Sequence, residues 1–199
     1  MQTKRPNRNL FYQDETYFDM KTKEKLLIGA AAGVGAAALV YTLWPKRSVP
    51  EGATVVQPFD RNRYLGKWHE IARLPNKIEQ NIKHLTEEYS LQDDGMIEVI
   101  TKGYDTKDNE WTAMIGKAKS AGPEDVGKLK VSYFGPFYAA YNVLDVDADY
   151  RYALVSGSGL DYLWILSREP SIPEDIKNRF LKKAAEIGFD TGKLEWEAA

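Results

Sequence analysis

The chain has 199 residues, of which 43% are hydrophobic and 28% charged, so it can form one globular domain of ordinary size with an additional segment. Its formal net charge of −2 at pH 7 differs from the basic surface of most nucleic-acid-binding proteins, and we expect no nucleic-acid partner. The sequence contains no cysteine, which excludes disulfides, thiol nucleophiles and cysteine-ligated metal sites.

An uncharged segment, residues 26–44, lies near the start of the chain and reads LLIGAAAGVGAAALVYTLW. A helix of this length spans about 28 Å at ~1.5 Å per residue, close to the hydrocarbon thickness of a bilayer. Tyr41 and Trp44 stand where interfacial aromatic residues are common. We therefore predict a single transmembrane helix over residues 26–44, which makes the chain a single-pass membrane protein.

The flanking charges predict how this helix is oriented. Cationic residues favour the cytoplasmic side of a membrane. They are concentrated before the segment, at Lys4, Arg5, Arg8, Lys21, Lys23 and Lys25. Only Lys46 and Arg47 follow it directly. Residues 1–25 are thus expected to form a cytoplasmic tail, and the domain after the helix is expected to be periplasmic or otherwise extracytoplasmic.

A cleaved signal peptide is the alternative interpretation, and it would make the main domain a secreted protein. The long charged leader and the length of the apolar segment favour a retained anchor. Gly29 and Gly33 form a G-x-x-x-G pair, a pattern that can bring two membrane helices into contact. A homodimer through this helix face is therefore one arrangement that the sequence allows.

Residues 45–57 are expected to form a linker, because prolines occur at positions 45, 50 and 58. Over residues 58–199, short alternating stretches recur between turn signals such as Asp93-Asp94-Gly95, a pattern typical of antiparallel barrels and sandwiches. The predicted strands cover residues 65–74, 84–91, 96–104, 111–119, 128–134, 138–146, 151–156 and 162–167. We predict an all-β domain in which these eight antiparallel strands close into an up-and-down barrel, because closure leaves no exposed strand edge.

The apolar period then changes to that of a helix. One stripe is formed by Ile172, Ile176, Phe180, Ala184 and Ile187. The S-x-x-E pattern of Ser171 and Glu174 predicts a capping box at the start of this helix, and Gly188 predicts its end. We expect one amphipathic C-terminal α-helix packed against the outside of the barrel, followed by a last short strand within residues 193–196.

The segment from about residue 58 to residue 196 resembles the bacterial lipocalins of the outer-membrane-lipoprotein type, kin of apolipoprotein D and of plant temperature-induced lipocalins. The matching stretches run in family order and read FDRNRYLGKWHEIARLP, EEYSLQDDG, VITKGY, FGPFYAAYNVLDVD, YRYALVSG and DYLWILSREP. A lone G-x-W motif would be weak support, whereas this ordered set covers nearly the whole domain. The resemblance implies an eight-stranded lipocalin barrel over residues 58–199.

The resemblance also assigns roles to three residues. Gly66 and Trp68 match the first family signature, and Arg168 matches the third. In the family the tryptophan closes the barrel floor and the arginine stacks over it, a contact that contributes about 0.5–2 kcal/mol. Close bacterial relatives often carry a lipid-modified cysteine at the mature N-terminus. This chain has none, so anchoring through residues 26–44 is expected in its place.

A barrel of eight strands is wide enough to hold one small ligand. Strand alternation gives a candidate lining of Tyr89, Val99, Trp111, Met114, Phe137, Tyr141 and Trp164. Glu70 and Glu87 share the parity of inward residues, and we expect each to pair with a cation or to lie at the wet mouth, because an unpaired buried carboxylate is costly. The resemblance implies a fatty acid or a lysophospholipid as the ligand.

Other motifs give no catalytic or metal site. Residues 122–128 fit the spacing of a phosphate loop but lack the Ser or Thr that binds magnesium. Asp145, Asp147 and Asp149 lack the glycine and the final glutamate of a calcium loop. With His69 and His84 as the only histidines, we expect neither a metal nor a cofactor.

These features predict a membrane-anchored lipocalin that binds a lipophilic ligand and stores or transports it, in the maintenance of an envelope membrane. We expect no enzymatic activity. Two alternatives from other classes stay open, namely a lipid-modifying enzyme that uses the same cavity and a membrane interaction or assembly protein.

Overall fold

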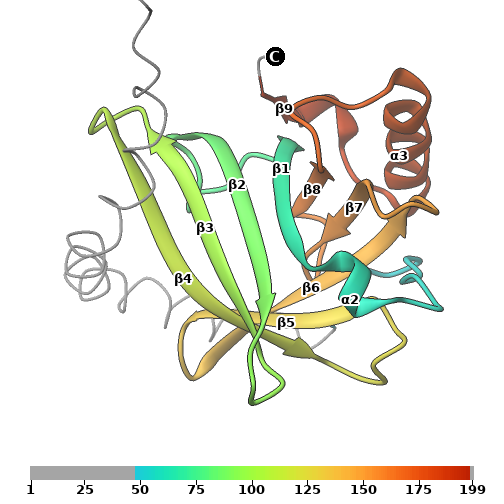
Figure 1. The fold of residues 1–199 in the computed structure, drawn as a ribbon. Helices are drawn as coiled ribbons and strands as arrows, with labels where there is room; N and C mark the ends of the chain where they lie inside the picture. The colour runs from blue at the N-terminus through green and yellow to red at the C-terminus, as the bar shows by residue number, and fades with distance from the viewer. Residues whose placement is uncertain (1–47, 198–199) are drawn as a thin grey trace, which may run out of the picture.

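The computed structural model describes residues 48–197 of the chain (Figure 1). The predicted cytoplasmic tail (1–25), the predicted transmembrane helix (26–44) and its Gly29/Gly33 pair lie outside the described residues. Within residues 48–197, no helix is both long enough and apolar enough to cross a membrane. The anchor and the dimer through it therefore stay predictions.

Eight antiparallel strands close into a barrel, as the alternating pattern predicted (Figure 1). Closure comes from β1, which pairs with β2 on one side and with β8 on the other. The strands are β1 Gly66–Arg73, β2 Ile82–Leu91, β3 Ile97–Asp105, β4 Glu110–Ser120, β5 Lys128–Phe134, β6 Phe137–Val146, β7 Tyr152–Ser156 and β8 Leu163–Ser167. The predicted last strand is present as β9 (Glu195–Trp196), which pairs with the end of β1.

A register shift within β1 lets this strand serve two packing layers. Its pairing with β8 is irregular between Glu70 and Ala72. Trp68 belongs to the core inside the barrel, whereas Ile71 and Ala72 pack in the core outside it. Two successive residues can face outward only because the shift interrupts the alternation. Beyond the shift, Arg73 lies on the same side as Glu70, inside the barrel.

The predicted C-terminal helix is α3 (Glu174–Ile187), which packs against the outer face of the barrel (Figure 1). Phe180 and Ala184 of the predicted stripe are buried against strands β1, β7 and β8. Gly188 ends the helix with a positive φ of 108°, and its N–H donates to the carbonyl oxygen of Ala184 at 3.1 Å. The glycine stop that the sequence predicted is therefore confirmed.

The predicted capping box is wrong. The helix begins at Glu174 with Pro173 in the N-cap position, and no side chain caps its first turn. A capping box needs a Ser or Thr at the N-cap and an acid three residues later. Here Ser171 lies outside the helix, and its carbonyl oxygen accepts a hydrogen bond from Ser167 Oγ at 2.8 Å.

Residues 48–57, which we predicted as part of a linker, run along the barrel wall. The N–H of Val56 donates to the carbonyl oxygen of Val143 at 2.9 Å, and its own carbonyl accepts from the N–H of Gly127 at 2.8 Å. The Val56 side chain packs against the inner core. The chain is thus held to β6 and to the start of β5 before it enters the barrel.

A short helix that the sequence did not predict, α2 (Arg61–Tyr64), lies at the end of the barrel where β1 begins (Figure 1). Asp60 is its N-cap, and one carboxylate oxygen accepts from the N–H groups of Asn62 and Arg63 at 2.9 and 3.3 Å. Four residues are too few to carry an apolar period, so only the cap could have signalled this turn.

Arg168 completes this closed end of the barrel. Its guanidinium carbon lies 3.8 Å from the centroid of the Trp68 ring, and its Nη1 donates to the carbonyl oxygen of Lys67 at 2.7 Å. Trp68 is fully buried, and its indole N–H donates to the carbonyl oxygen of Tyr64 at 2.8 Å. Gly66 has a φ of 91°, and a Cβ there would lie 3.4 Å from Arg168 Nη1, so the turn suits glycine.

Replacing Trp68 with alanine should lower the free energy of unfolding by about 3–5 kcal/mol, because the change leaves a large cavity in a fully buried position. Denaturant unfolding measures this loss. Trp196→Ala is the matched control: Trp196 is 40% exposed, and its loss should be under about 1 kcal/mol. An equally small loss for Trp68→Ala would contradict its role in closing the barrel.

Candidate ligand-binding site

The structure brings most of the predicted lining residues together inside the barrel. Tyr89, Val99 and Tyr141 belong to the inner core. Trp164 is partly buried against that core. Met114 lies opposite Thr101, a buried residue of β3 whose hydroxyl contacts that of Tyr133, two strands away on β5.

Phe137, another predicted lining residue, pairs with Phe134 at the hairpin between β5 and β6. Its position along β6 gives it the same parity as Ala139 and Tyr141. Phe137 is partly exposed, as expected for a residue near the mouth of the barrel.

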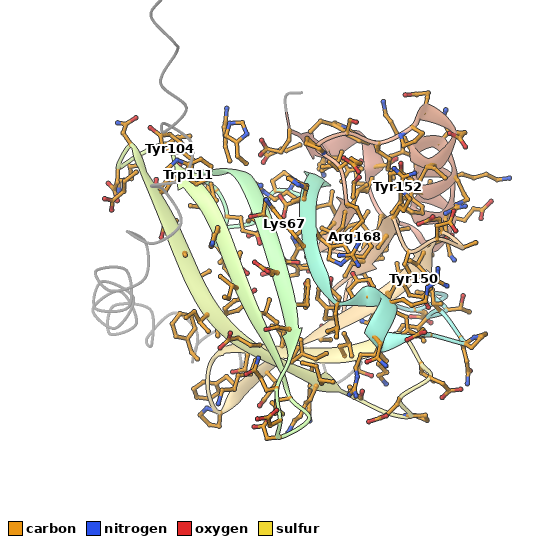
Figure 2. The ribbon with its side chains drawn as sticks, viewed as in Figure 1. Lys67, Tyr104, Trp111, Tyr150, Tyr152 and Arg168 are labelled. Carbon is orange, nitrogen blue, oxygen red and sulfur yellow. The ribbon has the colours of Figure 1, made fainter. Side chains whose placement is uncertain are left out.

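The inclusion of Trp111 in the lining is wrong. Trp111 lies opposite Tyr104 on the outer face of β3 and β4, and the two rings pack edge to face with centroids 5.6 Å apart. Its side chain is 60% exposed. Figure 2 shows Trp111 beside Tyr104. The pairing of β3 with β4 is regular throughout, so Trp111 and Met114, three residues apart, point to opposite faces.

A chain of hydroxyl groups crosses the inner core. The hydroxyl oxygens of Tyr64 and Tyr141 lie 2.7 Å apart, and the Tyr89 hydroxyl lies 3.0 Å from that of Tyr141. The same Tyr89 hydroxyl also contacts the carboxylate of Glu87. Burial raises the pKa of Tyr64, Tyr89 and Tyr141 above the ordinary value, so these phenols stay protonated.

Glu87 is the charged end of this chain. It lies on β2 opposite Trp68 on one neighbour and Thr101 on the other, which directs it into the barrel. Burial raises the pKa of Glu87 to about 7, while the hydrogen bond from Tyr89 opposes the rise. Glu87 therefore changes its charge near neutral pH, inside the space that a ligand would occupy.

A second polar cluster surrounds Arg73, beyond the register shift of β1. Arg73 Nη1 lies 2.5 Å from the carboxylate of Glu70, and both side chains are buried. Arg73 Nη2 donates to the carbonyl oxygens of Glu79 and Ile82 at 2.9 and 2.7 Å, which ties the loop between β1 and β2 to the barrel wall. Burial raises the pKa of Glu70, and the Arg73 guanidinium opposes that rise.

Glu79 joins this cluster to the predicted lining. Its carboxylate accepts from the indole N–H of Trp164 at 3.2 Å and lies 3.9 Å from Arg73 Nε. We expected a partner for Glu70 or a place at the wet mouth, but nothing in the sequence marked Arg73 or Glu79 as a site residue. Arg73 was hidden because the register shift reverses its expected parity, and Glu79 because it belongs to a loop.

The inward-facing side chains are mostly apolar, with an excess of acidic groups among the charged ones. Glu70, Glu79 and Glu87 all belong to this set, whereas Arg73 is the only cation at an inward-facing strand position within residues 48–197. Among those residues, no group of three or more His, Cys, Asp or Glu side chains could hold a metal ion. The arrangement suits an apolar molecule whose polar end approaches carboxylates and phenols.

Comparison with known proteins places this arrangement in a family. A family model described as a lipocalin-like domain matches residues 59–199. The chain is 46% identical over 170 residues to the outer membrane lipoprotein Blc of Citrobacter freundii, covering 85% of this chain and 96% of that protein. It is 34% identical over 149 residues to temperature-induced lipocalin-1 of Arabidopsis thaliana, covering 70% of this chain and 79% of that protein.

The fold also matches solved structures. Insecticyanin from the tobacco hornworm Manduca sexta superposes with a TM-score of 0.63 at 21% identity, over 77% of this chain and 87% of that chain. At this identity the likeness concerns the fold, and it supports the closed antiparallel barrel with one outer helix.

Glu87→Gln should flatten part of the dependence of stability on pH. Because the pKa of Glu87 is about 7 in the folded barrel, above the ordinary 4.5, the folded state binds the proton more tightly than the unfolded chain. The stabilising contribution is full below the unfolded value and is lost as pH rises through about 7. From about pH 5 to about pH 8 the parent should lose about 1–3 kcal/mol relative to the variant.

Urea unfolding across this range measures the difference. Glu88→Gln is the control, because Glu88 is the exposed neighbour on the opposite face of β2. Parallel stability profiles for the parent and Glu87→Gln would show that Glu87 does not titrate inside the barrel.

Proposed function

The chain belongs to the lipocalin family, and we propose that its barrel binds a lipophilic molecule and stores or transports it at a membrane of the cell envelope. The observation that carries this proposal is the inner wall, where apolar residues such as Val99 and Met114 stand beside tyrosines and carboxylates. Relatives named outer membrane lipoproteins support the envelope location. A role in membrane maintenance is part of the same proposal.

Binding explains the interior better than catalysis does. A general base or nucleophile needs a reactive group that faces the substrate. The phenols of Tyr64, Tyr89 and Tyr141 instead bond one another, and their raised pKa values keep them protonated. Glu70 is engaged by Arg73, and the Glu87 carboxylate accepts a hydrogen bond from the Tyr89 hydroxyl. The proposal therefore favours a carrier over a lipid-modifying enzyme.

We propose an elongated apolar ligand, a lysophospholipid in preference to a fatty acid. The interior cation Arg73 is already held by Glu70 at 2.5 Å, and no other inward-facing strand position of residues 48–197 offers a cation to a fatty-acid carboxylate. Such a carboxylate would instead meet Glu79 or Glu87, and like charges repel strongly in a low dielectric. A zwitterionic or neutral head avoids this repulsion.

We propose that residues 26–44 form the membrane anchor, with residues 1–25 in the cytoplasm, residues 45–57 as the connection and residues 58–199 as the extracytoplasmic lipocalin domain. The sequence holds no cysteine that could carry a lipid. A homodimer through Gly29 and Gly33 belongs to the same proposal. Secretion after signal cleavage is the alternative.

Met114→Trp should weaken ligand binding by more than about tenfold, because the larger side chain fills the inner space. Ile115→Trp is the matched control: Ile115 is the next residue of the same strand, 42% exposed on the outer face. The delipidated full-length protein is titrated with lysophosphatidylcholine, and binding is followed by calorimetry. Unchanged affinity in both variants would place the ligand outside the barrel.

The charge of the ligand head group should affect its affinity for the barrel. At about pH 8, lysophosphatidylcholine should bind at least about tenfold more tightly than the fatty acid with the same acyl chain, a difference of ~1.4 kcal/mol. The gap should narrow below pH 7, where Glu87 takes up a proton, and Glu87→Gln should narrow it at pH 8. A preference for the fatty acid at pH 8 would contradict the proposed head-group selection while leaving the cavity in place.

A further inference from the structure

Large apolar side chains are exposed in or beside three connections of the barrel. Ile78, in the loop between β1 and β2, is 63% exposed, and Leu160, in the loop between β7 and β8, is 44% exposed. Trp111 is the second residue of β4, directly after the hairpin that joins β3 to β4, and it is 60% exposed. These three residues, which we call the apolar rim, come from separate parts of the chain.

The three connections lie at one end of the barrel. The N–H of Thr106, in the β3–β4 hairpin, donates to the carbonyl oxygen of Asn81 in the β1–β2 loop at 2.9 Å. The N–H of Leu74, where that loop begins, donates to the carbonyl oxygen of Leu163, where the β7–β8 loop ends, also at 2.9 Å. Figure 2 shows Trp111 far from Arg168, so the rim surrounds the end opposite the closed one.

The described chain also begins beside this end. The side-chain amide of Asn142, which is fully buried, donates to the carbonyl oxygens of Ser48 and Gly157, each at 2.8 Å. Gly157 is the residue that opens the β7–β8 loop, which carries Leu160. Ser48 is therefore fixed next to one of the three connections of the rim.

The distance from Ser48 to the proposed anchor is short. The apolar segment ends at Trp44, four residues before Ser48. Four residues span at most about 14 Å when fully extended, at ~3.6 Å per residue. With residues 26–44 in the bilayer, as proposed above, the end of the barrel that carries the β7–β8 loop would lie within about one loop length of the membrane surface.

We propose that the apolar rim lies on the same bilayer that holds residues 26–44, so that the mouth of the barrel faces the lipid. This inference rests on the proposed anchor. A tryptophan beside aliphatic side chains suits the interfacial region of a bilayer. The β3–β4 hairpin beside the rim bears mixed charges such as Lys107 and Asp108, so contact depends on apolar burial and on the high local concentration that the tether provides.

This orientation gives the carrier a direct exchange route. A lipid could pass between the bilayer and the inner wall without crossing water, because the closed end with Trp68 and Arg168 points away from the membrane. A second copy of the chain could cover the apolar rim in place of the bilayer. Spin-label accessibility distinguishes these two arrangements.

The chain has no cysteine, so single cysteines can carry a spin label at chosen sites. Ile78→Cys and Leu160→Cys report on the rim. Leu91→Cys is the control, because Leu91 is 42% exposed, nearly the same as Leu160, at the β2–β3 end that lies beside α2. Each full-length variant is placed in phosphatidylcholine nanodiscs, and collisions of the label with oxygen and with a water-soluble nickel chelate are compared.

We expect the ratio of oxygen to nickel accessibility at positions 78 and 160 to exceed that at position 91 severalfold. Equal ratios at the three positions would overturn the inference. Dipolar broadening between rim labels that disappears on dilution with unlabelled protein would also overturn it, because a second copy would then cover the rim.

Co-migration of the protein with the nanodiscs tests the anchor separately. A protein that does not associate with lipid overturns both the anchor and the docking. A protein that associates but exposes its rim to nickel overturns the docking alone, and binding of lysophosphatidylcholine to the barrel is tested independently of either.

Discussion

The closed end of the barrel depends on where the guanidinium of Arg168 can place its hydrogen bonds. The short helix α2 leaves carbonyl groups without partners in its last turn, and Arg168 Nη2 donates to those of Arg63, Tyr64 and Leu65 at 2.8–3.2 Å. The same group covers the Trp68 ring. One side chain therefore joins α2, the start of β1 and the end of β8, and the barrel is closed by polar contacts over an aromatic plug.

The register shift in β1 determines which side chains of this strand face into the barrel and which face α3. Without it, strict alternation would turn one residue of the outer pair Ile71 and Ala72 and one residue of the inner pair Glu70 and Arg73 to the wrong side. With it, one strand supplies the surface on which α3 packs and the ion pair inside the barrel. The polar cluster in the open half of the barrel is thus a consequence of one irregular residue step.

Most of the fold could be predicted because its signals are local. Alternation and turn residues placed the eight strands within two residues of their observed ends, as with β5 at Lys128–Phe134, and a helical stripe located α3. The failures had non-local causes. Whether Ser171 caps a helix depends on how the chain leaves β8, and the side to which Arg73 points depends on the irregular pairing with that same strand.

The site was only partly predictable for a related reason. Inward residues on regular strands, such as Tyr89 and Tyr141, follow from parity, whereas Trp111 was misplaced although its parity conflicts with that of Met114. Strict alternation applied along the whole of β4 would have excluded Trp111 from the predicted lining. Glu79 could not be found this way, because a loop residue has no parity and its place was set by contacts with Arg73 and Trp164.

Along the barrel axis, stability and ligand selection occupy different levels. Trp68, Arg168 and α2 form the closed end, and the acidic cluster of Glu79 and Arg73 lies at the other end. The hydroxyl chain from Tyr64 to Glu87 lies between them and satisfies its own polar groups. Because Arg73 and Glu79 bond to Glu70, Trp164 and the β1–β2 loop, and not to the closed end, residues near the mouth can change to suit another ligand without loosening the floor. The same separation explains why the family signatures, which lie at the closed end, identify the lipocalin barrel but not its ligand. Ligand selection falls to residues that belong to no signature.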